Sequence, residues 1–478
     1  RDLPSPRGLP IIGNVHQLTT SPHVKLSEWA KEFGDLFRIK MGCFDTLVVT
    51  GYDNIRTALV KHSVAFAGRP PYETSKLFSN GLSLAFNNYS PAWEKQKRCT
   101  VKALKLYTAG PDLQKRNAME DTASYQANLL VDQLLASVNK DAITNPDEIV
   151  HHSATNVISN ICFGRSFSKN DPELQKFVSI NRAFDRAMGS AQIVNFWPFL
   201  KSVPVLGRSY QNLKAHMDVF WDFVFPNLKE HWKTYNPSNI RDIADCLWYQ
   251  SHLPDNNDCD AIDLQRRIAS AASDIFGAGY DTTHKVVLWS LFYMAAFPQY
   301  QQKIRDEVSR VVAPKGQITL RHHGDECPYV QAWIYEVLRH TSLAPILLPH
   351  YTTKEVTLNG VRIPAGVVVI FNAGQAHKDP KIWKNPDEFD PGHFLEEDGS
   401  KLRSEAVHKL LSWGAGKRRC PGAELSRHEI FVFVTTLVRR AYIGQAVDGV
   451  EPAFPWNTTG GISISPDPFR VKITERPS

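Results

Sequence analysis

One long helix limits what this chain can fold into. A helical pattern runs from about Ile262 to Phe297, where Pro298 stops it. At 1.5 Å per residue such a helix is ~50 Å long, enough to cross the whole molecule. Its middle holds Gly277 and Gly279, and each glycine costs roughly 1 kcal/mol relative to alanine. We therefore expect a local need for these glycines, and a flat helix surface would let a large ring approach.

The other patterns predict a mostly α-helical chain with small β-sheets near both ends. Alternating residues predict a strand over 36–41, and β-branched residues predict another over 46–50. The pair Asn359-Gly360 predicts a tight hairpin across 356–363, because both residues tolerate a positive φ. No internal repeat or low-complexity linker marks a boundary, so we expect one domain over residues 1–478.

Composition narrows the possible functions. The chain has 478 residues and a net charge of +6, and its basic residues are not interleaved with aromatic ones, which argues against nucleic-acid binding. A local basic patch that meets an acidic protein partner fits this mild charge better. No run of 18 apolar residues occurs, so nothing in the chain spans a bilayer. Seven scattered cysteines argue against a disulfide framework and for a reducing compartment.

The segment from Trp413 to Gly422 carries the most chemistry. Its three glycines let the backbone fold tightly and point N–H groups at the sulfur of Cys420. Such donors, with nearby cations, favour a thiolate, and a helix expected over 423–440 adds a positive helix end. One thiolate cannot build a zinc or iron–sulfur site, but it suffices for haem, whose porphyrin supplies the other four ligands. A buried free thiol is the alternative, and we accept it for the other six cysteines.

This loop resembles the signature of the cytochrome P-450 family, Phe-x-x-Gly-x-Arg-x-Cys-x-Gly, with Trp413 in place of Phe. The resemblance implies that fold, with the long helix over the haem and Cys420 as the iron ligand. The indole of Trp413 would pack beside the sulfur, where its N–H can also donate to the thiolate and raise the reduction potential.

A second motif, Glu336 to Arg339, resembles the Glu-x-x-Arg helix of the family. The two side chains share a helix face and can form a buried ion pair that locks the haem-side core. The usual third partner is the Arg of a Pro-x-Arg-Phe segment, and His393 stands in that position here.

A third motif begins at Trp93 and resembles the Trp-x-x-x-Arg helix of the family. Lys97 stands at the expected position and Arg98 follows it. Either cation can meet a haem propionate, and we hold the two equally. The resemblance adds Trp93, His350 and Arg418 as further cofactor contacts.

The middle of the long helix resembles the oxygen-activation motif of the family. A Thr282 hydroxyl that bonds back to the carbonyl of Ala278 would open a notch in the helix. The carboxylate of Asp281 would complete a proton relay into that notch. The alternative is a glycine contact between packed helices, with Asp281 solvated.

Several stretches, among them 154–158, 161–165 and 239–243, resemble the family 1 aryl hydrocarbon hydroxylases. Steroid 17-alpha-hydroxylase shares some of them and also resembles 66–70. By motif position, a pocket for a planar aromatic or steroid-like lipophilic substrate would take ten residues, with Phe184 as an aromatic platform. They are Ala85, Phe86, Asn181, Phe184, Asp274, Gly277, Ala278, Leu347, Ile462 and Ser463. The apolar members fit a plain core equally well.

The resemblance also implies partners and a location. We expect heme b, O2, and electrons from NADPH through NADPH-cytochrome P-450 reductase, which would dock near basic residues. Those residues are Lys95, Lys97, Lys409, Lys417, Arg418 and Arg419. We expect the cytoplasmic face of the endoplasmic reticulum membrane, an N-terminal anchor before Pro4 that this chain lacks, and lipid contact through the apolar stretch 196–206.

Three functions compete at this point. The first is a monooxygenase that inserts one oxygen atom of O2 into a lipophilic substrate. The second is a haem-thiolate isomerase or lyase that acts on peroxides without a reductase. The third is a non-catalytic carrier. The intact pair Asp281–Thr282 favours the first, because neither alternative needs a proton relay.

Overall fold

The computed structural model describes residues 3–18, 21–109, 113–168, 171–175, 192–253, 261–313, 316–446 and 462–476. Two of the expected pocket residues, Asn181 and Phe184, lie outside these ranges. All structural statements below concern the described part of the chain.

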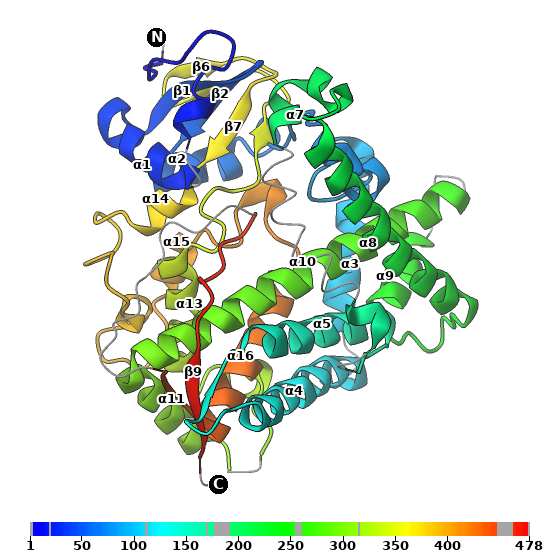
Figure 1. Ribbon diagram of the computed structural model, residues 1–478, viewed down its shortest axis with the longest axis vertical. Helices are drawn as coiled ribbons and strands as arrows, with labels where there is room; N and C mark the ends of the chain where they lie inside the picture. Colours follow the sequence, from blue (N-terminus) through cyan, green and yellow to red (C-terminus); the bar gives the residue numbers. More distant parts are fainter. Residues whose placement is uncertain are drawn as a thin grey trace.

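Helices make up most of the described chain, as the sequence predicted. They gather below and beside a strand-rich region that contains the N-terminus at the top of Figure 1. The longer helices are α1 (Pro22–Phe33), α3 (Pro91–Ala109), α4 (Leu113–Ala136), α5 (Asp147–Phe163), α8 (Arg208–Lys233), α9 (Ile243–Ser251), α10 (Ala261–Ala296), α11 (Pro298–Val311), α13 (Pro328–Thr341) and α16 (Ala423–Arg440). The shorter ones are α2 (Tyr52–Arg56), α7 (Ile193–Phe196), α12 (Leu320–His323), α14 (Ala373–His377) and α15 (Ser404–Lys409).

The strands form three small sheets. The first joins β1 (Leu36–Met41), β2 (Phe44–Val49), β7 (Val368–Phe371) and β4 (His350–Tyr351) in the order β1-β2-β7-β4, and only the pair β2–β7 is parallel. The second has the order β3-β9-β8, with β3 (Ile143–Thr144), β9 (Val471–Glu475) and β8 (Ala441–Gln445). The third is the predicted hairpin of β5 (Val356–Leu358) and β6 (Val361–Ile363), whose turn residues Asn359 and Gly360 have φ of 49° and 79°.

The long helix α10 crosses the middle of the molecule (Figure 1). It packs against α5, α8, α9, α13 and α16, and its bounds match the predicted helix within one residue at each end. Tertiary contacts on several faces supply the stability that keeps α10 helical through its two internal glycines.

The two glycines of α10 serve helix packing. A Cβ on Gly279 would lie 2.7 Å from Cδ1 of Ile158 on α5, and one on Gly277 would lie 3.0 Å from Cζ of Phe220 on α8. The expectation that Gly277 and Gly279 make room for a large ligand ring was therefore wrong, because their missing side chains make room for neighbouring helices. Ala278, between them, is exposed although Phe276 and Tyr280 are buried. The face of α10 that carries Ala278 therefore borders space that the protein does not fill.

Candidate functional site

The loop before α16 is folded tightly around the sulfur of Cys420. Gly414 and Gly416 have φ of 65° and 64°, the left-handed region that favours glycine. A Cβ on Gly416 would lie 1.7 Å from the carbonyl oxygen of Leu59, so no other residue fits there. The amide of Cys420 donates to the carbonyl of Trp413 at 2.8 Å and closes the loop.

Cys420 is an exposed residue whose sulfur is closely surrounded by protein atoms. Burial among these atoms raises the pKa of the thiol. The N–H of Gly422 and the charges of Arg419 and Lys97 act in the opposite direction. A bound iron would oppose the effect of burial and stabilise the thiolate.

Four buried or half-buried basic side chains gather between the Cys420 loop, α3 and β4. They are Arg69, Lys97, His350 and Arg418, called the open cation cluster below. None has a carboxylate within salt-bridge distance among the described residues, and they donate instead to backbone carbonyls. Arg418 Nε donates to Ala67 O at 2.7 Å, and Arg69 Nη1 donates to Leu348 O at 2.9 Å.

The indole of Trp93 lies among these cations. The guanidinium of Arg418 lies 3.9 Å from the Trp93 ring centroid, and the Lys97 ammonium lies 5.4 Å from it. Burial lowers the pKa of Lys97 to about 8, with the nearby Arg418 adding to the effect, and burial also lowers the pKa of Arg69, Arg418 and His350. Arg69, Lys97 and Arg418 are thus desolvated cations without counter-charges beside the neutral imidazole of His350, an arrangement that suits an anionic ligand.

The donor set fits a haem. The open cation cluster offers positive charge to two propionates, and Cys420 offers one axial thiolate. Arg69 was missed as a site residue at the sequence level, although it stands inside the stretch 66–70 that carried the steroid-hydroxylase resemblance. Its partners are the carbonyls of Ala85, Leu348 and Pro349, far from it in sequence.

The structure separates the two cations that the sequence held equal. The ammonium of Lys97 points into the Cys420 loop, where it donates to the carbonyls of Lys417 and, at 3.3 Å, of Arg419. Arg98 is exposed on α3. Of the two cations, only Lys97 therefore belongs to the open cation cluster.

Trp413, the first residue of the loop, packs against α13. Its ring meets Tyr335 edge-on, with 6.2 Å between centroids. Among the hydrogen bonds of the described residues, none joins the Trp413 indole to the Cys420 sulfur. The expected contact of the indole N–H with the thiolate therefore has no counterpart in this geometry.

The Glu-x-x-Arg motif forms a buried cluster in which all charges are matched. Arg339 donates to both oxygens of Glu336 at 2.7 Å, and its other N–H groups reach carbonyls of the segment 377–388. Two more groups contact Glu336 Oε1. His393 Nδ1 lies 3.2 Å from this oxygen, and the amide of Asp390 donates to it at 2.8 Å. Glu336, Arg339 and His393, called the saturated cluster below, tie α13 to the segment that precedes the Cys420 loop.

The middle of α10 has the hydrogen bond that the sequence predicted. Thr282 Oγ1 donates to the carbonyl oxygen of Ala278 at 2.8 Å. The carboxylate of Asp281 has protein partners, because Lys285 Nζ and Ser463 Oγ both donate to its Oδ2 at 2.9 Å. The neighbour Thr283 donates to Glu429 at 2.9 Å, and burial raises the pKa of that carboxyl to about 8.

The expected pocket residues separate into groups. Phe86 stacks on Phe78 with 4.0 Å between centroids, and Ile462 packs with Phe78 against Leu213. The carboxylate of Asp274 is hydrogen-bonded to the loop before α3. It accepts from the hydroxyls of Ser79 and Ser83 at 3.0 Å and from the amide of Leu84. Ala85 lies in that loop, Leu347 is buried with the strand-rich region, Gly277 faces α8, and Ala278 is open.

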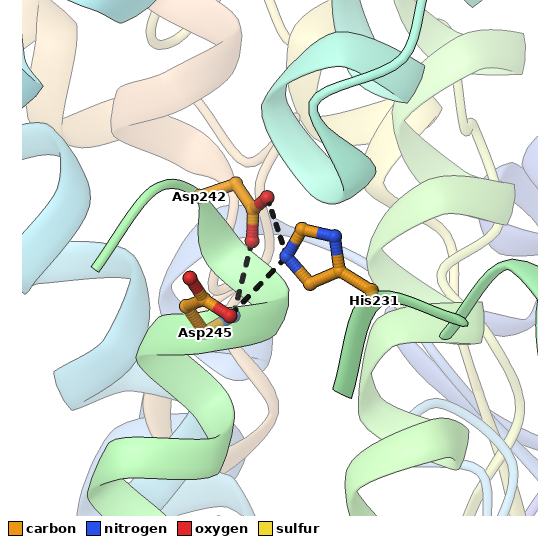
Figure 2. A group of neighbouring side chains, drawn as sticks. All are labelled: His231, Asp242 and Asp245. Atoms are coloured by element: carbon orange, nitrogen blue, oxygen red, sulfur yellow. Dashed lines mark hydrogen bonds and ion pairs between the residues drawn. The ribbon is translucent and has the colours of Figure 1, made fainter. Parts of the chain in front are cut away.

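A separate buried group has the donor types of a metal site. His231 Nε2 lies 2.8 Å from Asp242 and 3.2 Å from Asp245, as Figure 2 shows. Arg241 forms an ion pair with Asp245, with 2.8 Å between Arg241 Nε and Asp245 Oδ2. Despite burial, these carboxylates raise the pKa of His231 to about 9, so the imidazole is protonated near neutral pH and acts as a cation in this arrangement. The group balances two cations against two carboxylates and holds α8 to α9.

Comparisons with known proteins agree with this geometry. The family model described as Cytochrome P450 matches residues 3–473. The chain is 35% identical over 447 residues to Cytochrome P450 1A1 of Homo sapiens, covering 91% of this chain and 85% of that protein. It is 32% identical over 485 residues to Cytochrome P450 1A1 of Oncorhynchus mykiss, covering 99% and 91%.

A solved structure of a zebrafish cytochrome P450 with progesterone shows the same fold. Its TM-score is 0.83 at 26% identity, over 95% of this chain and 99% of that one. The expected fold class and family resemblance are therefore confirmed, and family membership implies a haem and a redox partner. This chain belongs to the cytochrome P450 family of haem-thiolate monooxygenases.

Proposed function

We propose that this enzyme inserts one oxygen atom of O2 into a lipophilic substrate, in one catalytic domain over residues 1–478. Two electrons come from NADPH through NADPH-cytochrome P-450 reductase, so that RH, O2, NADPH and H+ give ROH, H2O and NADP+. The observation that carries the proposal is the Thr282–Ala278 hydrogen bond of 2.8 Å next to a carboxylate, Asp281. Such an acid–alcohol pair serves proton delivery, which an isomerase acting on peroxides does not need.

Bound haem supplies the redox chemistry with O2, and the residues of this chain supply its setting. Cys420 would bind the haem iron, and the open cation cluster beside Trp93 would hold the propionates. The Thr282 hydroxyl donates to Ala278 and keeps its lone pairs for a water molecule. That water is the last proton carrier, and Asp281 connects it to the proton source.

The proposed substrate is lipophilic and planar aromatic or steroid-like. Support comes from the apolar contacts of Phe78, Phe86, Leu213 and Ile462, and from the open surface at Ala278. The human relative is named Cytochrome P450 1A1, and the zebrafish structure contains progesterone. The roles of Phe184, as an aromatic platform, and of Asn181 remain predictions.

The proposed docking surface for the reductase is smaller than the sequence suggested. Lys97 and Arg418 point inward, Lys417 pairs with Glu94, and Lys409 pairs with Glu405. Arg419, with Arg98 on α3, is exposed. These two cations form the centre of the proposed contact with an acidic partner.

We also propose contact with the endoplasmic reticulum membrane on its cytoplasmic face. Within the described ranges, no helix has the length and apolar character needed to cross a bilayer. The stretch 196–206 nevertheless exposes Phe199, Val205 and Leu206 at 67%, 81% and 45% of their surface, while Phe196 and Leu200 are buried. Exposed apolar side chains on a short surface segment suit insertion at the depth of lipid headgroups.

The test of the function is the fate of electrons in a Thr282→Ala variant. Wild type with reductase and NADPH should convert a planar polyaromatic or a steroid to an oxygenated product. Thr282→Ala should keep haem, substrate binding and NADPH consumption, while product per NADPH falls sharply and hydrogen peroxide rises. The measurement is product, peroxide and NADPH side by side.

The matched control is Ser290→Ala. Ser290 also bonds back into α10, at 2.9 Å to Val286 O, but it is fully buried and away from the notch. This control should couple electrons to product as wild type does. Unchanged coupling in Thr282→Ala would contradict the proton-delivery role, and conversion of lipid hydroperoxides by wild type without reductase would favour the isomerase alternative.

A further inference from the structure

A buried lysine stands one helical turn after the carboxylate of the proposed relay. Lys285 follows Asp281 by four residues on α10, and its side chain is 4% exposed. Lysine is almost never fully buried unless its charge is paired. Its ammonium lies 2.9 Å from Asp281 Oδ2 and 2.8 Å from Ser463 Oγ.

The three polar groups form a closed triangle. Lys285 donates to both partners, and the Ser463 hydroxyl donates to Asp281 Oδ2 at 2.9 Å. The same oxygen of Asp281 thus accepts from two donors, while the carboxylate side chain stays 32% exposed. The lysine and the serine therefore fix the orientation of this carboxylate and leave its other oxygen open.

The triangle joins α10 to the C-terminal segment 462–476, which is far away in sequence. Two further hydrogen bonds hold that segment next to Ser463. Trp289 Nε1 on α10 donates to Ile464 O at 3.0 Å, and the amide of Ile464 donates to Leu343 O at 2.7 Å. The preceding residue, Ile462, belongs to the apolar contacts with Phe78 and Leu213 that support the proposed substrate pocket.

The charges around Asp281 favour its ionised form. Burial alone would raise the pKa of Asp281, but Lys285, then His284 and the Ser463 hydroxyl, bring it below its usual value. His284 on α10 itself faces Asp147 of α5, at 2.9 Å. Lys285 is thus the main counter-charge of Asp281, and its removal would leave a partly buried carboxylate without its main cation.

We propose that Lys285 is a positioning residue that holds the Asp281 carboxylate against Ser463, and that it thereby links proton supply at Thr282 to the C-terminal wall of the substrate pocket. The link to proton supply rests on the monooxygenase function proposed above. A substrate that displaces the segment at Ile462 would pull on Ser463 and loosen the hold on Asp281.

The first measurement needs no turnover. Hydrogen exchange of the haem-loaded protein should show the segment 462–469 opening about tenfold more often in Lys285→Met than in wild type, since a buried tie to α10 is lost. The matched control is Arg267→Met, which removes another pair of the same spacing on α10, Arg267–Asp263 at 2.6 Å. That variant should exchange at 462–469 as wild type does.

The second measurement is the pH profile of product formed per NADPH. In Lys285→Met the pKa of Asp281 should rise, because burial is no longer opposed by the ammonium. The decline in coupling that follows protonation of Asp281 should then move to higher pH, with more peroxide at neutral pH. Lys285→Arg, which keeps the charge, should restore most of the wild-type profile.

Four outcomes of these measurements decide between the proposal and its alternatives. Faster exchange at 462–469 together with a shifted profile supports the proposal. Wild-type exchange in Lys285→Met, or faster exchange with an unchanged profile, overturns it. A wild-type enzyme that forms no product refutes the proposed function instead, and the exchange result still shows whether Lys285 holds the segment.

Discussion

Two groups of buried charge in this molecule differ in how they are satisfied. In the saturated cluster, the guanidinium of Arg339 has a protein acceptor for Nε, Nη1 and Nη2, and Glu336 accepts from Arg339, His393 and the amide of Asp390. In the open cation cluster, the described residues place no carboxylate next to Arg69, Lys97 or Arg418. The guanidinium of Arg418 also donates from Nε, Nη1 and Nη2, but only to backbone carbonyls. The two clusters therefore differ in charge: protein carboxylate neutralises the first, and an anionic ligand would neutralise the second.

The difference separates residues that maintain the fold from residues that bind the cofactor. Removing one partner of a buried ion pair costs roughly 3–5 kcal/mol, because the other charge stays buried and unpaired. Removing one of several like charges that already repel each other does not destabilise the empty protein in this way. Binding of the anionic cofactor, in contrast, depends on those charges.

The largest effect should follow from Arg339→Leu. Glu336 then remains buried without its cation, and we expect a loss of roughly 3–5 kcal/mol in the free energy of unfolding, much of the stability of a typical domain. The measurement is urea denaturation, or the yield of soluble protein if the variant does not fold. Arg427→Leu is the control, because it removes a more exposed pair with Glu424 on α16 and should change stability by about 0.5 kcal/mol or less. Equal stability of the two variants would mean that the saturated cluster does not hold the core.

A smaller effect should separate Lys97 from Arg98. Lys97→Met should release haem about tenfold faster than wild type, since a charge-assisted hydrogen bond is worth roughly 1.5–3 kcal/mol. The free energy of unfolding of this variant without haem should equal that of wild type or be slightly larger. Arg98→Met should release haem at the wild-type rate, because Arg98 is exposed on α3. Transfer of haem to an acceptor protein measures both rates, and faster loss from Arg98→Met alone would reverse the assignment.

Local patterns predicted the elements well. The span of α10, the helix over 423–440 and the hairpin at Asn359-Gly360 all follow from spacing, proline and turn residues close in sequence. The Thr282–Ala278 hydrogen bond was also predictable, because an i, i−4 contact lies within one helix turn.

Contacts between residues far apart in the sequence could not be predicted from local patterns. Gly279 faces Ile158 on another helix, so its glycine is explained by packing that no local pattern reports. The same holds for Lys285, whose partner Ser463 lies at the other end of the chain, and for Asp274, which the loop with Ser79 and Ser83 takes up. Spacing predicts which side chains share a face, and only the fold shows what meets that face.

The reduced, carbon monoxide-treated spectrum of Cys420→Ser tests the central assignment most directly. Only a thiolate opposite carbon monoxide moves the haem absorption to the red end of the Soret region. Wild type should show that band, as should Cys43→Ser, which replaces another exposed cysteine outside the loop. Cys420→Ser should lack the band even when it still binds haem. A Cys420→Ser protein that keeps it would show that another cysteine ligates the iron.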